Sequence, residues 1–522
     1  MNASKLKQKW VWMILFILFT TMFTCWSLIT PISDGPDEAA NIVQAAAVDH
    51  GQFEGTRLPY QWAGAKMYEV RIPWFYALTE YSMECQAQTA VSNCSLQTLV
   101  KAHCSFTVFI RLQANVANCT AKNVGDFSKP AVGFTYVEKY PPDYYLLVGI
   151  PSLFMPPGYD AVYLMREISI LVSSGLLASL FLSIYQLKRR KWTFLGVLIA
   201  MTPTAIYLQS IVNGINLEGL AGLCFVFYAS QLALDSIDFP KRLLYRMCFA
   251  GVILISVRPT GIVWFAVDLI PIIGLWAAHQ NKKWIVDKKI RVSASILAAA
   301  GALNIIWQVA VGQNEVVNNF SVQGGIVRSF YYAIKNQYRL QNLTEIVGQF
   351  SNVGNYVKSP FPVTIIWLLC WVGIVVQAIL KGKKEPKFAL LVYLYGYIFI
   401  ALLMDAYFVP TFGRAYWQEY FGFGAMTGIP VLAGIILDSS STNENRAENL
   451  LTSFLPYLLW TLVFVNFMVV ERWDTNGWSP IVPPAILISV ELITLFLILS
   501  IMVPLNKSKF DKHKIDELKI SS

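Results

Sequence analysis

Repeated apolar runs of membrane-spanning length constrain this chain more than any other feature of its sequence. A helix needs about 20 consecutive apolar residues to cross the hydrocarbon core of a bilayer. Runs near that length lie at about 10–30, 161–187, 192–212, 215–234, 243–257, 259–278, 293–312, 361–380, 388–404, 419–437, 448–470 and 481–504. The sequence therefore predicts an all-α integral membrane protein with about twelve transmembrane helices. The run at 243–257 is short and precedes Pro259, so a broken or re-entrant helix is the alternative there.

Charge is scarce and its placement indicates topology. Only 14% of the 522 residues are charged, against roughly a quarter in soluble domains. The net charge of +9 comes from basic clusters beside apolar runs, at 5–9, 188–191, 241–242, 282–291, 381–387 and 507–514. This is the positive-inside pattern, which places both termini in the cytoplasm of a multi-pass cell-membrane protein and argues against a nucleic-acid partner. The first run is longer than a signal-peptide core and is expected to stay as an anchor.

The long polar connections divide the chain into six segments. Two of them are too polar to span and are expected outside the cell, the first being by far the longest connection. The segments are 1–30 (cytoplasmic tail and first span), 31–160 (large extracytoplasmic loop domain), 161–312 (spans), 313–360 (second extracytoplasmic loop), 361–504 (spans) and 505–522 (basic cytoplasmic tail).

Three carboxylates follow the first span directly, in the motif Ser33-Asp34-Gly35-Pro36-Asp37-Glu38. Asp34, Asp37 and Glu38 would emerge at the outer membrane surface, where they can act on a substrate that stays in the bilayer. They are also the group that could hold Mg²⁺ or Mn²⁺. The structural alternative is that Asp34 or Gly35 caps a helix that begins at Pro36 and lies along the membrane interface. The two interpretations are compatible.

Further polar residues interrupt or end the spans on the same side. The outer loop returns through Glu138-Lys139-Tyr140-Pro141-Pro142-Asp143-Tyr144-Tyr145, either as an aromatic anchor or as a site with Lys139 near a lipid phosphate. Charge at the edge of a membrane is costly and often functional, and two arginines on one face suit an anionic phosphate. The residues concerned are Asn213, Asn216, Glu218, Arg258, Asp405, Arg414 and Glu419.

The eight cysteines form two groups. Cys85, Cys94, Cys104 and Cys119 share the first outer loop, where an oxidising environment predicts two disulfides with three alternative pairings. A zinc site using His103 is the rival interpretation, which the lack of paired C-x-x-C spacing disfavours. The other four cysteines lie within apolar runs as small packing residues.

Four short motifs, in this order, resemble a known family. They are Pro36-Asp37-Glu38, Tyr140-Pro141-Pro142-Asp143-Tyr144-Tyr145, Thr202-Pro203 with Val212-Asn213, and Gly413-Arg414 followed by Tyr416. The arrangement resembles the GT-C superfamily of membrane glycosyltransferases, which use polyprenyl-phosphate-linked sugars, and more narrowly the bacterial domain-of-unknown-function 2142 family. The resemblance implies a GT-C-like fold and transfer of a sugar from a polyprenyl-phosphate donor to an envelope glycan, teichoic acid or lipid on the outer face.

The resemblance also implies roles for individual residues. Asp37 would be the general base, with Glu38 and Asp34 orienting the acceptor or binding a metal. Arg414 and Arg258, and then Lys139, would hold the lipid phosphate. The expected substrate pocket comprises Tyr140, Asp143, Asn213, Asn216, Glu218 and Tyr416. Two other hypotheses remain open, a transporter or flippase for an envelope precursor and a non-catalytic scaffold for envelope assembly.

Overall fold

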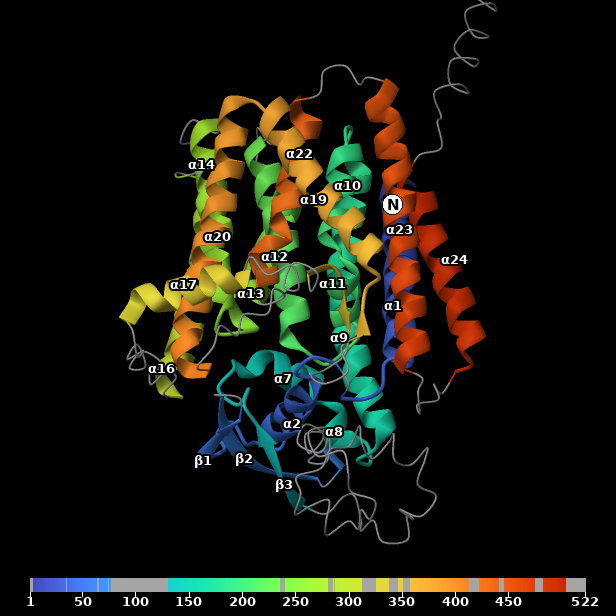
Figure 1. Ribbon diagram of the computed structural model, residues 1–522. Coiled ribbons are helices and arrows are strands. Elements are labelled where there is room, and N and C mark those ends of the chain that lie inside the picture. The colour runs from blue at the N-terminus through green and yellow to red at the C-terminus, as the bar shows by residue number, and fades with distance from the viewer. Residues whose placement is uncertain are drawn as a thin grey trace, which may run out of the picture.

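A bundle of long helices with a small domain at one end makes up the computed structural model (Figure 1). The structure describes residues 3–503 except 34, 63–64, 74, 77–129, 235–239, 280–284, 286, 312–324, 338–345, 351–356, 413–421, 441–445 and 475–481. Three predictions fall on residues outside this description: the role of Asp34, the disulfides of the first loop and the late Gly-Arg motif. All three stay predictions.

Ten helical segments of the described chain are long and apolar enough to cross a membrane. One of them joins two short helices, α21 (Phe423–Met426) and α22 (Gly428–Ser440). The others are α1 (Ala3–Ile29), α9 (Tyr159–Gln186), α12 (Gly214–Leu234), α14 (Gly261–His279), α16 (Lys288–Ala310), α19 (Phe361–Lys381), α20 (Lys384–Phe412), α23 (Arg446–Asp474) and α24 (Pro484–Met502). The prediction of a multi-pass helical membrane protein is confirmed.

Two of the twelve expected spans take a shorter form. The run at 192–212 is not one helix but α10 (Lys191–Ala200) and α11 (Pro203–Leu208). The break lies at Thr202, whose hydroxyl accepts a hydrogen bond from the Ala205 amide at 3.1 Å, and the ring of Pro203 begins the new helix. The run at 243–257 forms α13 (Lys241–Ser256), which is 16 residues long. The short length of the second run was visible in the sequence, whereas the break in the first run was not predicted.

The basic clusters gather at one end of the bundle. Because successive helices run in opposite directions, the end of α9, the start of α13, the start of α16 and the start of α20 lie together, at the top of Figure 1. The elements of the first loop lie at the opposite end. This is the arrangement that the positive-inside interpretation requires, and the assignment of the basic end to the cytoplasm stays a prediction.

The first loop folds as a small domain around α2 (Glu38–Asp49). Strands β1 (Thr56–Trp62), β2 (Ala65–Pro73) and β3 (Pro130–Thr135) form an antiparallel sheet in that order. Helix α2 packs between this sheet and α7 (Pro142–Val148), which is followed by α8 (Pro151–Phe154). Every residue from Glu38 to Val48 is buried, so the expected interfacial helix is instead the core of the domain. The polar side chains of this stretch, Glu38, Asn41 and Gln44, are buried and hydrogen-bonded within the protein, so the helix presents no polar face to solvent.

The second loop contributes α17 (Gly325–Gln337) and a two-stranded hairpin, β4 (Gln349–Phe350) with β5 (Val357–Lys358). Phe350 is buried against Trp26 of α1 and Tyr207 of α11, with ring centroids 5.9 and 5.4 Å apart. The hairpin therefore packs against α1 and α11.

Close backbone packing at the centre of the bundle makes a testable prediction. Helix α12 meets α21 at Gly222, where an added Cβ would lie 1.8 Å from the carbonyl oxygen of Gly424. We expect Gly222→Ala to destabilise the protein by about 1–3 kcal/mol, because the two helices must separate. Gly175→Ala in α9 is the matched control, since a Cβ there meets nothing within 4 Å. Thermal unfolding in detergent measures both; equal midpoints for the two variants would contradict this packing.

Candidate active site

The acidic turn after α1 exposes one carboxylate. Asp37 precedes α2 with a left-handed backbone (φ 58°), a conformation that aspartate tolerates better than most residues. Its side chain does not cap the helix; Tyr136 donates its hydroxyl hydrogen to Asp37 Oδ1 at 2.5 Å. Helix α2 begins at Glu38 and not at Pro36, so the expected cap at Asp34 or Gly35 is wrong. The half-buried Asp37 is thus held by a tyrosine and has an oxygen left to accept a proton.

The surroundings of Asp37 make its carboxylate more basic. Burial raises its pKa above the usual aspartate value, and the Tyr136 hydrogen bond and the positive charge of Arg258 oppose that rise in part. A general base works best when its pKa approaches the working pH. The site therefore combines a basic carboxylate with a nearby cation.

The neighbouring Glu38 carboxylate is fully engaged. Its Oε1 accepts hydrogen bonds from Arg166 Nε at 2.6 Å and the Val212 amide at 3.1 Å. Its Oε2 accepts hydrogen bonds from Arg166 Nη2 at 2.7 Å and the Ser33 amide at 3.0 Å. Two hydrogen bonds to each oxygen fill the four acceptor sites of a carboxylate. Glu38 is consequently a structural anchor, and it does not fit the role of a metal ligand.

Arg166 of α9 is equally satisfied. Besides its bonds to Glu38, Nη1 donates to the carbonyl oxygens of Ser27 and Thr30 at 2.8 Å each, and Nη2 donates to that of Pro31 at 2.9 Å. All five N–H donors of the guanidinium are used in a residue with no exposed surface. These carbonyls include the unpaired groups at the end of α1, which a cation stabilises.

Sequence analysis missed Arg166. Its signal is a charged residue inside the apolar run at 161–187, a position where charge is costly and needs a partner. The partner, Glu38, lies 128 residues away in sequence, so no local spacing reveals the pair.

A second buried ion pair supplies the cation of the site. Arg258, between α13 and α14, contacts Glu218 of α12 through Nη1 and Oε2 at 2.9 Å. Thr260 donates its hydroxyl hydrogen to Glu218 Oε1 at 2.8 Å. The Arg258 guanidinium lies over the ring of Tyr140, 5.4 Å from its centroid, with the hydroxyl oxygen 3.5 Å from Nη2. The structure thus joins three predicted site residues that the sequence could only name separately.

The two predicted asparagines position the backbone. Asn213 donates from Nδ2 to the carbonyl oxygen of Pro36 at 2.8 Å, and its Oδ1 accepts from the Ile215 amide at the start of α12. Asn216 accepts from the Leu217 amide. Tyr145 of α7 donates to Asn41 Oδ1 at 2.7 Å, and Asn41 donates from Nδ2 to the Asp37 carbonyl at 2.7 Å. Asn213 and Asn41 thereby fix the acidic turn from both sides.

The remaining described candidates lie at the edge of this group. Lys139 Nζ stands over the Tyr68 ring, 5.5 Å from its centroid, and the Lys139 carbonyl accepts the Trp307 indole hydrogen at 3.2 Å. Asp143 is exposed in the first turn of α7. Burial raises the pKa of Glu138 to about 7, although the Gly55 amide donates to its Oε1 at 2.6 Å. Asp34, Arg414, Tyr416 and the four loop cysteines lie outside the described residues.

No three metal-ligating side chains of the described ranges come together. With Glu38 bound to Arg166, only Asp37 of the three expected carboxylates is described and available, so we derive no step through a metal.

Comparison with known proteins gives one family and one distant structural likeness. Residues 19–416 match the family model described as "Predicted membrane protein (DUF2142)". Two solved structures of ArnT from Cupriavidus metallidurans, one bound to undecaprenyl phosphate and one in the apo state, share 12% identity with this chain. Their TM-scores are 0.42 and 0.41, over 94% of this chain and 76% of theirs. No curated protein sequence matches significantly.

The closed network of Glu38 and Arg166 is testable by a double-mutant cycle. We expect Glu38→Gln and Arg166→Met each to lower stability by about 3–5 kcal/mol, because each leaves a buried charge without its partner. The double variant should lose clearly less than the sum, as measured by thermal unfolding in detergent.

The surface pair of Lys381 and Glu448 is the control for this cycle, since the Lys381 side chain is 46% exposed. Lys381→Met should change stability by less than about 1 kcal/mol. Additive losses at Glu38 and Arg166, or an Arg166→Met variant as mild as Lys381→Met, would refute the network.

Proposed function

The chain belongs to the DUF2142 family of predicted membrane proteins, and we propose that it is a GT-C-type glycosyltransferase. It would move a sugar from a polyprenyl-phosphate donor to an envelope glycan, teichoic acid or lipid on the extracytoplasmic face. One observation carries the proposal: a half-buried carboxylate of raised pKa, Asp37, lies within the electrostatic influence of the buried cation Arg258. The first is suited to activating a hydroxyl, and the second to receiving a phosphate.

The proposed reaction is a single displacement. Asp37 takes the proton from the acceptor hydroxyl as that oxygen attacks the anomeric carbon of the sugar. The bond between this carbon and the lipid phosphate oxygen breaks, and the released phosphate carries away the bonding electrons. Arg258 stabilises the charge that develops on it. Configuration at the anomeric carbon is inverted, and Asp37 later returns its proton to solvent.

The surrounding residues would keep the two groups in place. Tyr136 fixes the orientation of the Asp37 carboxylate through its 2.5 Å hydrogen bond. Glu218, which also accepts a hydrogen bond from Thr260, binds the Arg258 guanidinium, and Tyr140 lies against one face of it. Because Glu218 balances part of the arginine charge, the site can release a lipid phosphate after the transfer. Arg414, outside the described residues, remains the second proposed phosphate ligand.

A transporter or flippase is the second candidate, and carboxyl groups deep in the spans favour it. Asp268 of α14 accepts a hydrogen bond from Tyr393, and Glu491 of α24 accepts one from the Trp26 indole at 3.1 Å. Both side chains are fully buried. Under this alternative, Asp268→Asn would abolish function, whereas the glycosyltransferase does not need that charge. A scaffold, the third hypothesis, would tolerate neutral substitution at Asp37.

The direct test is sugar analysis of the envelope from cells carrying Asp37→Asn, compared with wild type and a deletion. We expect the point mutant to lose the same sugar as the deletion, because removal of a general base lowers the rate by about 10²–10⁴-fold. Asp49→Asn, at the other end of α2, is the matched control and should retain transfer. Normal amounts of correctly inserted Asp37→Asn protein with an unchanged envelope would refute the general base.

The pH dependence of transfer tests the environment of Asp37. The base acts when deprotonated, so activity should rise with pH through an apparent pKa above the ordinary aspartate value. Tyr136→Phe removes a hydrogen bond that favours the carboxylate, and should move this acidic limb to higher pH while activity at high pH is largely kept.

Glu138 is a nearby carboxyl group whose pKa burial raises to about 7. Glu138→Gln should leave the limb where it is. A limb that disappears in Glu138→Gln, or that does not move in Tyr136→Phe, would remove Asp37 from the role of base.

A further inference from the structure

A large cavity lies at the basic end of the bundle, opposite the candidate active site. Its volume is about 630 Å³, within the roughly 300–1,000 Å³ typical of small-molecule sites. Its walls come from the connection of α9 to α10, the ends of α12 and α14, the connection of α19 to α20, and α22. Segments distant in sequence therefore enclose one space.

The floor of this cavity contains a buried polar side chain without a protein partner. Gln231 of α12 is only 5% exposed and lines the cavity, and its amide makes no hydrogen bond within the described chain. The Gln231 amide reaches the cavity and can take its hydrogen bonds from water or from a ligand there. Gln231 offers two N–H donors and one acceptor to such a ligand.

One acid, Asp438, also lines the cavity. Asp438 of α22 accepts hydrogen bonds from the Trp192 amide at 3.2 Å, the Thr193 amide at 2.8 Å and the Thr193 hydroxyl at 2.6 Å. Its carboxylate lies beside the first turn of α10, where the helix dipole favours negative charge. This carboxylate keeps its negative charge, so the described lining carries three cations, Lys188, Arg189 and Lys383, against this one anion.

The rim is cationic. Lys188 and Arg189 come from one connection and Lys383 from another, and His279 ends α14 between them. Within the described residues Lys188 and Lys383 form no ion pair, in contrast to Lys381, which is bound to Glu448. The positive-inside pattern explains the sign of these charges, but not their convergence around a hollow with a buried amide.

We propose that this cavity binds a phosphate ester, with the phosphate between Lys188 and Lys383 and a polar group on Gln231. The charge and the position at the bundle end suit either the headgroup of an anionic phospholipid or a soluble phosphorylated molecule. A bare phosphate ion would leave most of the 630 Å³ unfilled. The site is independent of the proposed transfer reaction at the other end of the helices.

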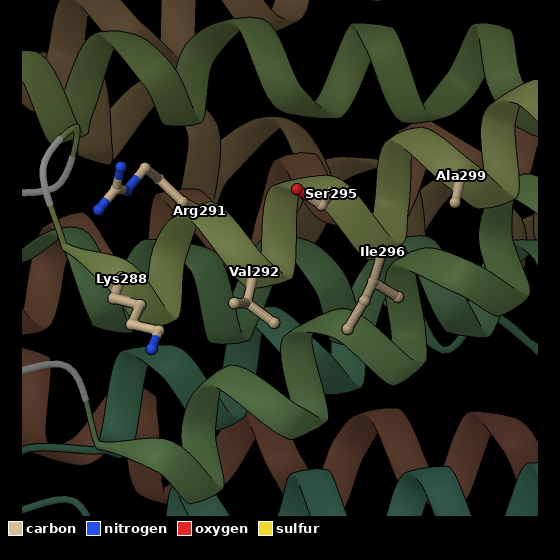
Figure 2. A pocket seen from close by; sticks show the side chains of 6 residues that line it. All are labelled: Lys288, Arg291, Val292, Ser295, Ile296 and Ala299. Carbon is tan, nitrogen blue, oxygen red and sulfur yellow. The ribbon is translucent and has the colours of Figure 1, made fainter.

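A second hollow at the same end provides the control. It is a groove of about 540 Å³ along α16, with Lys288 and Arg291 beside Val292, Ile296 and Ala299 (Figure 2). All six of its lining residues, which include Ser295, come from this one helix. Like the first cavity, this groove is lined by cations, but it has no buried amide and no walls from other helices. Lys288→Gln therefore removes a charge from the same end of the protein without touching the proposed site.

Ligand-dependent thermal stabilisation of the purified full chain tests the proposal. The probes are glycerol 3-phosphate added to protein in neutral detergent, and phosphatidylglycerol added to phosphatidylcholine nanodiscs. We expect one probe to raise the unfolding midpoint of wild type and of Lys288→Gln. Binding should be at least about tenfold weaker in Lys188→Gln/Lys383→Gln and in Gln231→Leu, since each loses ligand contacts worth about 1.4 kcal/mol or more.

The two probes distinguish a soluble phosphate ester from a lipid headgroup. Stabilisation by glycerol 3-phosphate indicates a soluble ligand, and stabilisation by phosphatidylglycerol alone indicates a lipid headgroup. No stabilisation by either probe, or equal stabilisation of wild type and Gln231→Leu, would overturn the proposal. Midpoints measured without a probe establish that each variant is folded.

Discussion

The buried pair of Glu38 and Arg166 is the interaction on which the end of the bundle that carries the α2 domain depends. Two charges removed from water destabilise a fold unless their hydrogen-bonding capacity is met. Here five guanidinium donors and four carboxylate acceptor sites are all occupied. The bonds join the end of α1, the start of α2, Arg166 in the first half of α9, and Val212. Four separate stretches of chain are therefore held at one point, and the acidic turn has little freedom to change shape.

This constraint separates two adjacent carboxylates into different roles. Glu38 is saturated and cannot accept a further proton without breaking the network. Asp37, one residue earlier, is turned outward by its left-handed backbone and meets a single tyrosine hydroxyl. Asn213 and Asn41 bind the backbone on either side of it, so the direction of its side chain is set by the same framework. Arg258 is fixed in a similar way. It binds Glu218, which also accepts a hydrogen bond from Thr260, and one face of its guanidinium lies against Tyr140.

Much of the architecture could be predicted from the sequence, because hydropathy reports burial in lipid directly. The long spans, the outer loop domain and the asymmetry of basic residues follow from that one property. The break at Thr202-Pro203 did not, since both parts of the run are equally apolar and only local capping distinguishes them. Residues such as Tyr140, Glu218 and Arg258 could be selected for their unusual polarity, but their mutual contacts depend on packing between distant helices. Arg166 was missed because the surrounding apolar run outweighed one charge, and the role expected for Glu38 changed once its partner was known.

The most direct test of this account is an experimental structure of the protein with a polyprenyl phosphate bound. The account predicts the phosphate within hydrogen-bonding distance of the Arg258 guanidinium, Asp37 facing the space beside it, and the bonds between Glu38 and Arg166 unchanged. A phosphate bound by Arg166, or one that lies away from both Asp37 and Arg258, would contradict the division into a structural and a reactive carboxylate.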